Sequence, residues 1–251
     1  MSNNELFKYI LSLGDDALVL GQRLSEWAYK APFLEEDIAL SNISLDLFGR
    51  ANLFLEYASL LKKDGATADS LAFKRSEREF TNYLICEQPN GNFADTMVRQ
   101  FFIDAFNKLF LESLADSKDK QLSSIAQKSI KETNYHIRHS SKWIIRLGDG
   151  TPESNSRVQS SINDLWVYTG ELFTMDQSEN NLINKKIAVD RTKLKSRWDI
   201  IVNDCLKEAT LTRPKDAYMK IGGRAGIHTE HLGHLLSDMQ YLQRAYPGAK
   251  W

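Results

Sequence analysis

Apolar residues recur at a helical period along most of the chain, and short clusters rich in glycine, proline and polar residues separate the periodic stretches. Strand-like alternation is nearly absent: its best instance, KIAVD from Lys186, is five residues long and has no partner. Asp119 and Thr151 stand where a side-chain oxygen can cap a helix, and Pro152 suits a first helical turn. The pattern predicts helices over residues 4–29, 35–63, 71–87, 93–114, 120–147, 153–175, 191–208 and 229–245.

Two of these predicted helices, 35–63 and 93–114, are apolar on almost every side. A helix without a polar face is packed by neighbours on most of its circumference. Long helices joined by short connections are typical of antiparallel bundles. We therefore expect an all-α fold, an antiparallel helical bundle with accessory C-terminal helices, in a single domain over residues 1–251.

The composition of the 251 residues narrows the classes of partner. The chain carries 32 Lys and Arg against 33 Asp and Glu, and no block of one sign stands out, so we expect neither nucleic acid nor a membrane as a partner. It has neither a secretory leader pattern nor an apolar run long enough to span a membrane. The only cysteines, Cys86 and Cys205, lie in predicted helices, as is usual in a reducing compartment. These features predict a cytoplasmic protein.

A helical bundle can hold a di-iron centre through one Glu from each of two helices and a Glu-x-x-His pair from each of the other two. Residues i and i+3 share one face of a helix, which is why this spacing suits a metal. No acid in the chain is followed by His three residues later, and all five histidines lie in the second half. The sequence therefore predicts no metal site.

The spacing of four acids nevertheless echoes such a site: Asp16, Asp46, Asp104 and Glu132. Asp46 follows Asp16 by 30 positions, and Glu132 follows Asp104 by 28. Where a ligand histidine would stand, Asp46 is followed by Gly49 and Glu132 by Tyr135. We interpret these six positions as the vestige of a metal site. Buried carboxylates need compensation, or else they face water. The candidates for compensation are Arg23, Arg50, Arg138 and Lys108.

Two histidine-bearing segments admit other roles. In KETNYHIRH, the side chains of Glu132, His136, His139 and Trp143 share one stripe, where a histidine more often packs with a hydrogen bond than binds a metal. In GIHTEHLGHLL, His228, His231 and His234 recur at a spacing of three residues. A closed structural zinc site usually recruits cysteine, so a helix start or a contact between subunits is the favoured role. The sequence leaves open whether this cluster binds anything.

Four segments carry a family resemblance: LGDDALVLGQRLSEWAYKAPFLEEDIALSNISLDLFGRA, EQPNGNFADTMVRQFFIDAF, KSIKETNYHIRHSSKWIIRLGDG and GIHTEHLGHLLSDMQYLQRAYPGAKW. They resemble the C-subunit family of the multicomponent 1,2-phenylacetyl-CoA epoxidase, in the ferritin-like superfamily. The runs NGNFADT and HTEHLG are its most specific parts, and the likeness extends from Leu13 to Trp251.

The resemblance implies a non-catalytic, ferritin-like structural subunit of phenylacetate catabolism. Such a subunit binds and supports the catalytic A subunit of the monooxygenase complex, beside the other subunits. It carries no cofactor itself, and the di-iron centre is expected in the partner A subunit. The resemblance also implies acyl-CoA contact at two segments: Glu79, Phe80, Thr81 and Asn82, and Asn180, Asn181 and Leu182.

Three alternatives stay open. The chain could be a di-metal oxygenase or oxidase in its own right, using Glu132 with His136 or His139. It could be a ferritin-like storage or binding module with another partner. The isolated chain could form a homodimer. Which face meets a partner is not given by the sequence.

Overall fold

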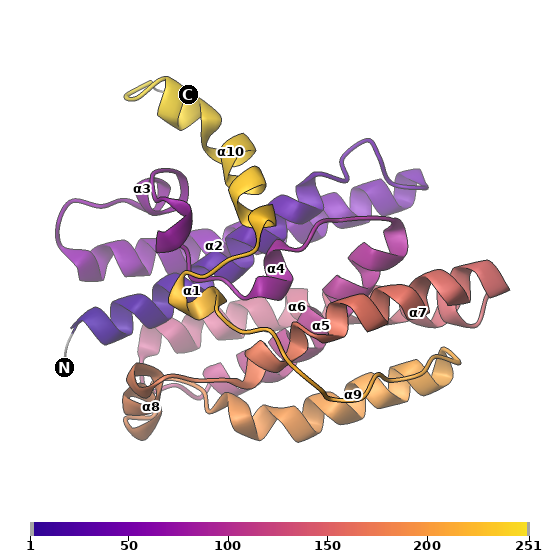
Figure 1. Ribbon diagram of the computed structural model, residues 1–251. Helices are drawn as coiled ribbons and strands as arrows, with labels where there is room; N and C mark the ends of the chain where they lie inside the picture. The colour runs from indigo at the N-terminus through magenta and orange to yellow at the C-terminus, as the bar shows by residue number, and fades with distance from the viewer. Residues whose placement is uncertain (1–2, 250–251) are drawn as a thin grey trace. The chain divides into compact units, whose positions relative to one another are not determined.

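The structure is a computed structural model that describes residues 3–249. Within that range the chain forms ten α-helices and four short 3-10 helices and contains no strand, so the all-α prediction is confirmed (Figure 1). The chain divides into two compact units, one made of Met1–Pro89 with Gly222–Trp251 and the other of Asn90–Ile221. The expectation of a single domain over residues 1–251 stays a prediction.

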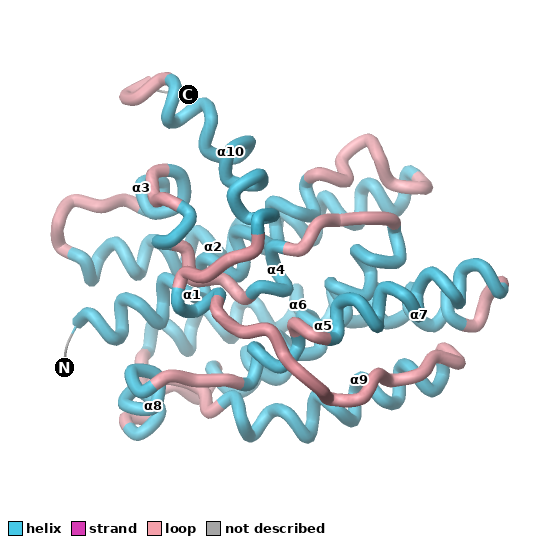
Figure 2. Tube along the Cα trace, viewed as in Figure 1, coloured by secondary structure: helices cyan, strands magenta, loops and turns pink. Residues whose placement is uncertain are grey.

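The first unit joins both ends of the sequence. Its elements are α1 (Asn3–Ser25), α2 (Leu34–Lys62), α3 (Ala68–Phe73), η1 (Glu77–Glu79), α4 (Leu84–Glu87), η4 (Gly223–Ala225) and α10 (Glu230–Ala245). The long connection that leads from the second unit to α10 is drawn mostly as loop in Figure 2.

Helices α1 and α2 form the antiparallel pair at the centre of this unit. Gly14 faces Leu55, whose side chain a Cβ on Gly14 would meet at 2.8 Å, and Gly21 faces Phe48 in the same way at 3.1 Å. The Ser44 hydroxyl donates to the Gly21 carbonyl at 2.8 Å. The two glycines let the helix backbones approach closely, which fixes the register of the pair.

The second unit is built around α5. Its elements are α5 (Phe93–Leu114), α6 (Lys120–Gly148), α7 (Pro152–Trp166), η2 (Thr169–Phe173), α8 (Gln177–Asn184), η3 (Arg191–Leu194) and α9 (Lys195–Glu208). Helix α5 packs against α6, α7 and α9. The Phe102 ring contacts the rings of Trp166 and Trp198 at centroid distances of 5.5 and 5.8 Å, and the Trp198 indole donates to the Phe102 carbonyl at 3.0 Å. An aromatic core therefore holds this unit together.

The predicted helix starts are confirmed where a side chain caps the helix. Asp119 accepts hydrogen bonds from two backbone N–H groups of α6. Thr151 forms a capping box with Ser154, and Pro152 lies in the first turn of α7. The prediction of one continuous helix over residues 71–87 is wrong, because residues 74–83 are not α-helical. Helix α8 was not predicted, and the predicted helix 153–175 consists of α7 followed by η2.

Two further findings concern the predicted environment of the chain. Within residues 3–249 no helix has the length and apolar composition needed to cross a bilayer. Cys86 and Cys205 are both buried and are not joined in a disulfide.

Candidate functional site

Two adjacent acids in the middle of α1, Asp15 and Asp16, begin a cluster of charged groups inside the first unit. Successive helix residues point about 100° apart, so the two carboxylates face different neighbours. Asp15 is fully buried and forms a two-pronged ion pair with the Arg75 guanidinium, in which Nη1 lies 3.0 Å from Oδ2. The Thr81 backbone N–H and hydroxyl donate to the same Oδ2 at 2.9 and 3.1 Å.

Asp16 pairs with Arg224, which comes from the far end of the sequence. Nη1 and Nη2 of Arg224 lie 3.0 and 2.6 Å from the two carboxylate oxygens, and the Tyr83 backbone N–H donates to Oδ1 at 2.8 Å. The guanidinium also stacks on the Tyr83 ring, 3.6 Å from its centroid. Burial raises the pKa of Asp16 to about 6, against the opposing effect of Arg224, so the carboxylate is still ionised at neutral pH.

Glu87, at the end of α4, forms the third part of the cluster and is completely buried. Its Oε2 accepts from Asn82 at 2.8 Å and lies 2.7 Å from Nδ1 of His228, while Oε1 accepts from the backbone N–H and hydroxyl of Thr229 at 2.6 and 2.9 Å. The carboxylate thus sits at the N-terminus of α10, where a negative charge is favourable.

His228 carries a positive charge in this arrangement. Its Nδ1 faces the Glu87 carboxylate and its Nε2 faces the Phe80 carbonyl at 2.9 Å, so both ring nitrogens meet acceptors and both must carry protons. Burial lowers the pKa of His228, but the hydrogen bonds to Glu87 and Phe80 and the nearby carboxylates outweigh it, and the net pKa is raised. We call Asp15, Asp16, Arg75, Glu87, Arg224 and His228 the buried ion-pair cluster.

The cluster explains why residues 74–83 leave the helix that was predicted over 71–87. The backbone N–H groups of Thr81 and Tyr83 bond to the carboxylates of Asp15 and Asp16. An N–H group used in this way is not available to a carbonyl four residues earlier in a helix. Tertiary contacts thus override local helix preference in this segment.

Two glycines allow the chain end to reach this segment. A Cβ on Gly223 would lie 2.1 Å from the Asn82 carbonyl oxygen, and one on Gly226 would lie 2.4 Å from that of Arg78. Gly226 also has a φ of +72°, which favours glycine. The GGRAG turn therefore delivers Arg224 to Asp16.

Three of the six vestigial metal-site positions, Asp16, Asp46 and Gly49, lie in the first unit. Because α1 and α2 run antiparallel and Gly14 faces Leu55, Asp16 lies beside the turn of α2 that contains Leu53. By the same register, Asp46 lies beside the turn of α1 that contains Arg23. The two acids are therefore about two helical turns, or ~11 Å, apart along the helix pair, and the structure does not bring them to one level. Gly49 is exposed and nothing lies within 4 Å of the Cβ it lacks.

The other three vestigial positions lie in the second unit with the same offset. Asp104 is buried and accepts hydrogen bonds from Gln100 at 2.7 Å and Ser140 at 2.8 Å. Glu132 is half-buried and lies eight residues, about two turns, before Ser140 on α6. Tyr135 is exposed. The equal offsets match the similar spacings of the two acid pairs in the sequence, 30 positions for Asp16 and Asp46 and 28 for Asp104 and Glu132, which we call the half-to-half similarity.

The seven residues expected to contact acyl-CoA differ in burial and lie in two different units. In the first unit Glu79 is exposed and Thr81 is half-buried, but Phe80 and Asn82 are fully buried. In the second unit Asn180 and Asn181 are half-buried on α8, and Leu182 is buried. Among the first four residues, only Glu79 and Thr81 can therefore meet a ligand without a local rearrangement.

The late histidines do not act together. His228 precedes α10 and belongs to the buried ion-pair cluster, the carbonyl of half-buried His231 accepts from Arg23 at 2.9 Å, and His234 is exposed. Within residues 3–249 no group of three or more His, Cys, Asp or Glu side chains is arranged to hold a metal ion.

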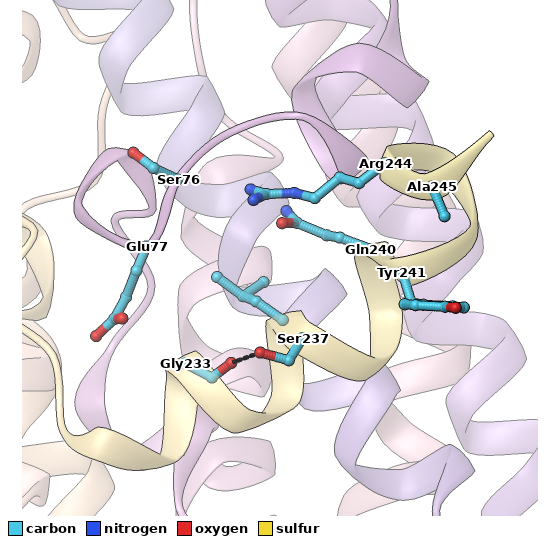
Figure 3. Close-up of a pocket in the computed structure, with 9 residues that line it drawn as sticks. Ser76, Glu77, Gly233, Ser237, Gln240, Tyr241, Arg244 and Ala245 are labelled. Carbon is cyan, nitrogen blue, oxygen red and sulfur yellow. Dashed lines mark hydrogen bonds between the residues drawn. The ribbon is translucent and has the colours of Figure 1, made fainter. Parts of the chain in front are cut away.

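A groove of about 600 Å³ lies between η1 and α10 (Figure 3). The Arg244 and Gln240 side chains reach from α10 to the Arg75 carbonyl, each at 3.0 Å, and Glu77 projects from the opposite side. The groove thus borders the segment that contains Glu79 and Thr81.

Most of the cluster was not found in the sequence. The candidates named to neutralise Asp16 did not include Arg224, and Asp15, Arg75, Glu87 and the charge on His228 were also missed. One signal was present: the pair DD inside the apolar run LSLGDDALVLG places at least one acid on a buried face. A buried carboxylate requires a cation, which directs attention to distant arginines.

Comparison with known proteins identifies a family and a relative of this chain. The whole chain, residues 1–251, matches the family described as phenylacetic acid catabolic protein. A relative from Escherichia coli (strain K12), the C subunit of 1,2-phenylacetyl-CoA epoxidase, is 50% identical over 248 residues, which cover 99% of this chain and 100% of the relative.

Proposed function

The chain belongs to the phenylacetic acid catabolic protein family, and we propose that it is a non-catalytic structural subunit of a 1,2-phenylacetyl-CoA epoxidase that binds and supports the catalytic A subunit. Its relative from Escherichia coli is named as the C subunit of that enzyme. The di-iron centre expected for the reaction would lie in the A subunit, and this chain would act by holding the helices of its partner in place.

The buried ion-pair cluster is the observation that carries the non-catalytic role. Asp15 and Asp16 are inward acids of a bundle helix, and both of their oxygens are engaged by arginine and backbone donors. A guanidinium supplies the positive charge that a bound metal would otherwise provide to such carboxylates. These two carboxylates are therefore already occupied by other donors, which supports a structural role for the cluster.

An apolar strip on the outer face of α2 supports the binding role. Leu34, Ile38 and Leu45 are 73%, 54% and 65% exposed, and at 100° per residue they point within about 40° of one another. A contiguous exposed apolar patch is typical of a protein interface. We assign this strip, which we call the α2 strip, to the contact with the A subunit.

Metal analysis tests the non-catalytic role. The purified chain, incubated anaerobically with Fe(II) and then desalted, should retain far less than one iron per chain and should not epoxidise phenylacetyl-CoA. The A subunit should gain activity when this chain is added. Two irons per chain, lost together with activity in Glu132→Ala, would establish the alternative of a di-metal oxygenase.

Binding measurements test the interface. The variant Leu34→Ser/Ile38→Ser/Leu45→Ser should keep its helical content, because these side chains are exposed, and should bind the A subunit at least about tenfold more weakly. Leu60→Ser is the matched control, since Leu60 is 74% exposed near the other end of the same helix. Unchanged affinity of the triple variant would remove the α2 strip from the interface.

Two expectations from the resemblance belong to the same proposal. Acyl-CoA contact by this chain would involve Glu79 and Thr81, which closely follow the groove-lining residue Glu77 in the sequence, whereas Phe80 and Asn82 would hold the segment in shape. Protection of this segment from hydrogen exchange by phenylacetyl-CoA would support the contact. The cytoplasmic location also stays a prediction.

A further inference from the structure

The outer face of α6 is strongly and uniformly cationic. Six exposed basic residues occupy it: Lys120, Lys128, Lys131, Arg138, Lys142 and Arg146. The remaining exposed residues of the helix are Gln, Ser, Asn and Tyr, and its only acid, Glu132, is half-buried. We call the six basic residues the α6 stripe.

Helix geometry makes these residues a single continuous surface. At 100° per residue they fall within about 80° of the helix circumference, and at 1.5 Å per residue the stripe extends over ~40 Å from Lys120 to Arg146. The exposed ring of Tyr135 lies near the middle of the stripe, with the Arg138 guanidinium 5.7 Å from its centroid.

The α6 stripe differs from an ordinary solvated helix face. Elsewhere in the same unit, three pairs of exposed or half-buried helix charges lie one turn apart: Lys108 with Glu112, Glu153 with Arg157 and Lys195 with Asp199. Among the described residues, no Asp or Glu forms an ion pair with any member of the stripe.

The neighbours along α6 are instead of like charge. Lys142 lies four residues after Arg138 and four before Arg146, and Lys128 lies three before Lys131. Like charges at these spacings destabilise a helix. The stripe therefore costs the isolated chain stability, and a partner that neutralises it would recover that cost.

The corresponding face of α2 shows that the fold itself does not require these charges. The internal similarity that pairs Asp46 with Glu132 also pairs Leu34 with Lys120 and Leu45 with Lys131. The same offset pairs the other four members of the stripe with Asn42, Asn52, Glu56 and Leu60. The α2 face is thus mixed and carries no basic residue, as expected if each face meets a chemically different surface.

We propose that the α6 stripe docks an acidic face of a second protein subunit of the enzyme, separate from the contact made by the α2 strip. A small anionic ligand would use a concave site, whereas the stripe is a convex helix face about 40 Å long. Nucleic acid is the less favoured occupant, because domains that bind it are usually basic overall and this chain has a net charge of −1.

Opposite charge along such a face accelerates association and sets its orientation, and its effect falls with salt. The partner should therefore present Asp and Glu along a surface of comparable length. The charge totals of the whole sequence concealed this feature, because the balancing acids lie on other elements.

The test measures binding of the full chain to each of the other epoxidase subunits from the same organism, all purified separately. It rests on the proposed function only for the choice of these subunits as probes. At least one subunit should bind wild type with an affinity that falls about tenfold between about 50 and about 200 mM NaCl. The variant Lys131→Glu/Arg138→Glu/Lys142→Glu should bind that subunit at least about tenfold more weakly, mainly through slower association.

The matched control reverses the same number of charges at exposed sites of the same unit outside the stripe, Lys185→Glu/Lys207→Glu/Lys215→Glu, and should stay within about twofold of wild type. If the stripe variant also stays within twofold for every subunit, the proposal is overturned. Tighter binding of wild type to a short DNA duplex than to any subunit, lost in the stripe variant, would replace it with a nucleic-acid site.

A failure of the proposed function gives a different pattern, because then no subunit binds wild type at all. Binding to poly-L-glutamate then tests whether the α6 stripe is a docking surface for acidic chains. Wild type should bind it at low salt, the control should match wild type, and the stripe variant should not bind. Equal binding by all three proteins would overturn the assignment of the stripe.

Discussion

Replacing Glu87 by Gln removes one negative charge from the buried ion-pair cluster while preserving side-chain shape. Gln keeps one carbonyl oxygen for the two bonds from Thr229, but its NH₂ then faces Asn82 Nδ2 and His228 Nδ1, which are both donors. Two bonds to a charged group are lost, at about 1.5–3 kcal/mol each. Deprotonation of His228 recovers part of this, so we expect a loss of about 3 kcal/mol, near the low end for a broken buried ion pair.

The loss should depend on pH with a definite sign. The pKa of His228 is raised in the folded chain above its ordinary 6.5, so the native state binds more protons than the unfolded state between 6.5 and the folded pKa. The pair's contribution is therefore complete below about 6.5 and declines as the pH rises through the folded pKa. Asp16 titrates in both proteins, so its contribution cancels in the difference. The destabilisation by Glu87→Gln should shrink between about pH 6 and about pH 9.

Urea unfolding followed by circular dichroism measures this difference. Histidine NMR titration, with His228 assigned by His228→Gln, should show its pKa falling in Glu87→Gln. Glu35→Gln is the control, because Glu35 is exposed and is not among the groups that shift the pKa of His228, and it should change stability by less than about 0.5 kcal/mol. A loss below about 1 kcal/mol at about pH 6, or a loss that grows with pH, would refute the charged state assigned to His228.

Further predictions follow from other contacts. Arg75→Met leaves Asp15 as an unpaired buried charge and should cost about 3–5 kcal/mol in urea unfolding, much of it recovered when Asp15→Asn is added. Gly223→Ala should destabilise the fold by more than about 2 kcal/mol, because the added Cβ meets a backbone oxygen. Gly49→Ala should stabilise the fold by about 0.5–1 kcal/mol, because Gly49 lies in the middle of α2 with open space around it. Thermal melts measure both changes. Burial raises the pKa of the Cys205 thiol to about 12, so in native protein it should react with a disulfide reagent at mildly alkaline pH far more slowly than after denaturation.

The sequence was sufficient to predict a helix where residues within the segment itself determine its structure. Helix α5 occupies the predicted residues 93–114, because Asn92 and Asp95 form a capping box directly before an apolar run. The segment 74–83 could not be predicted in this way. The backbone N–H groups of Thr81 and Tyr83 are bound by Asp15 and Asp16, which lie 66 and 67 residues earlier in the chain, and no local pattern records such a partner.

The candidate site shows the same division. Sequence spacing identified Asp16 as an inward acid, but its cation is Arg224, 208 residues away, which no periodicity connects to it. The half-to-half similarity is reflected in equal offsets between Asp16 and Asp46 and between Asp104 and Glu132. That similarity did not reveal the levels of these acids, because the level depends on the helix register, which Gly14 and Gly21 fix by close packing.

The first unit takes its residues from both ends of the chain, and this affects the order in which the protein can assemble during synthesis. The second unit is continuous in sequence and can fold as soon as Ile221 has emerged from the ribosome. Asp15 and Asp16 are made early, but the cation of Asp16 and the imidazolium that meets Glu87 come from Arg224 and His228, which are made after the second unit is complete. The first unit therefore cannot complete these two ion pairs until its last segment, which contains α10, has been made.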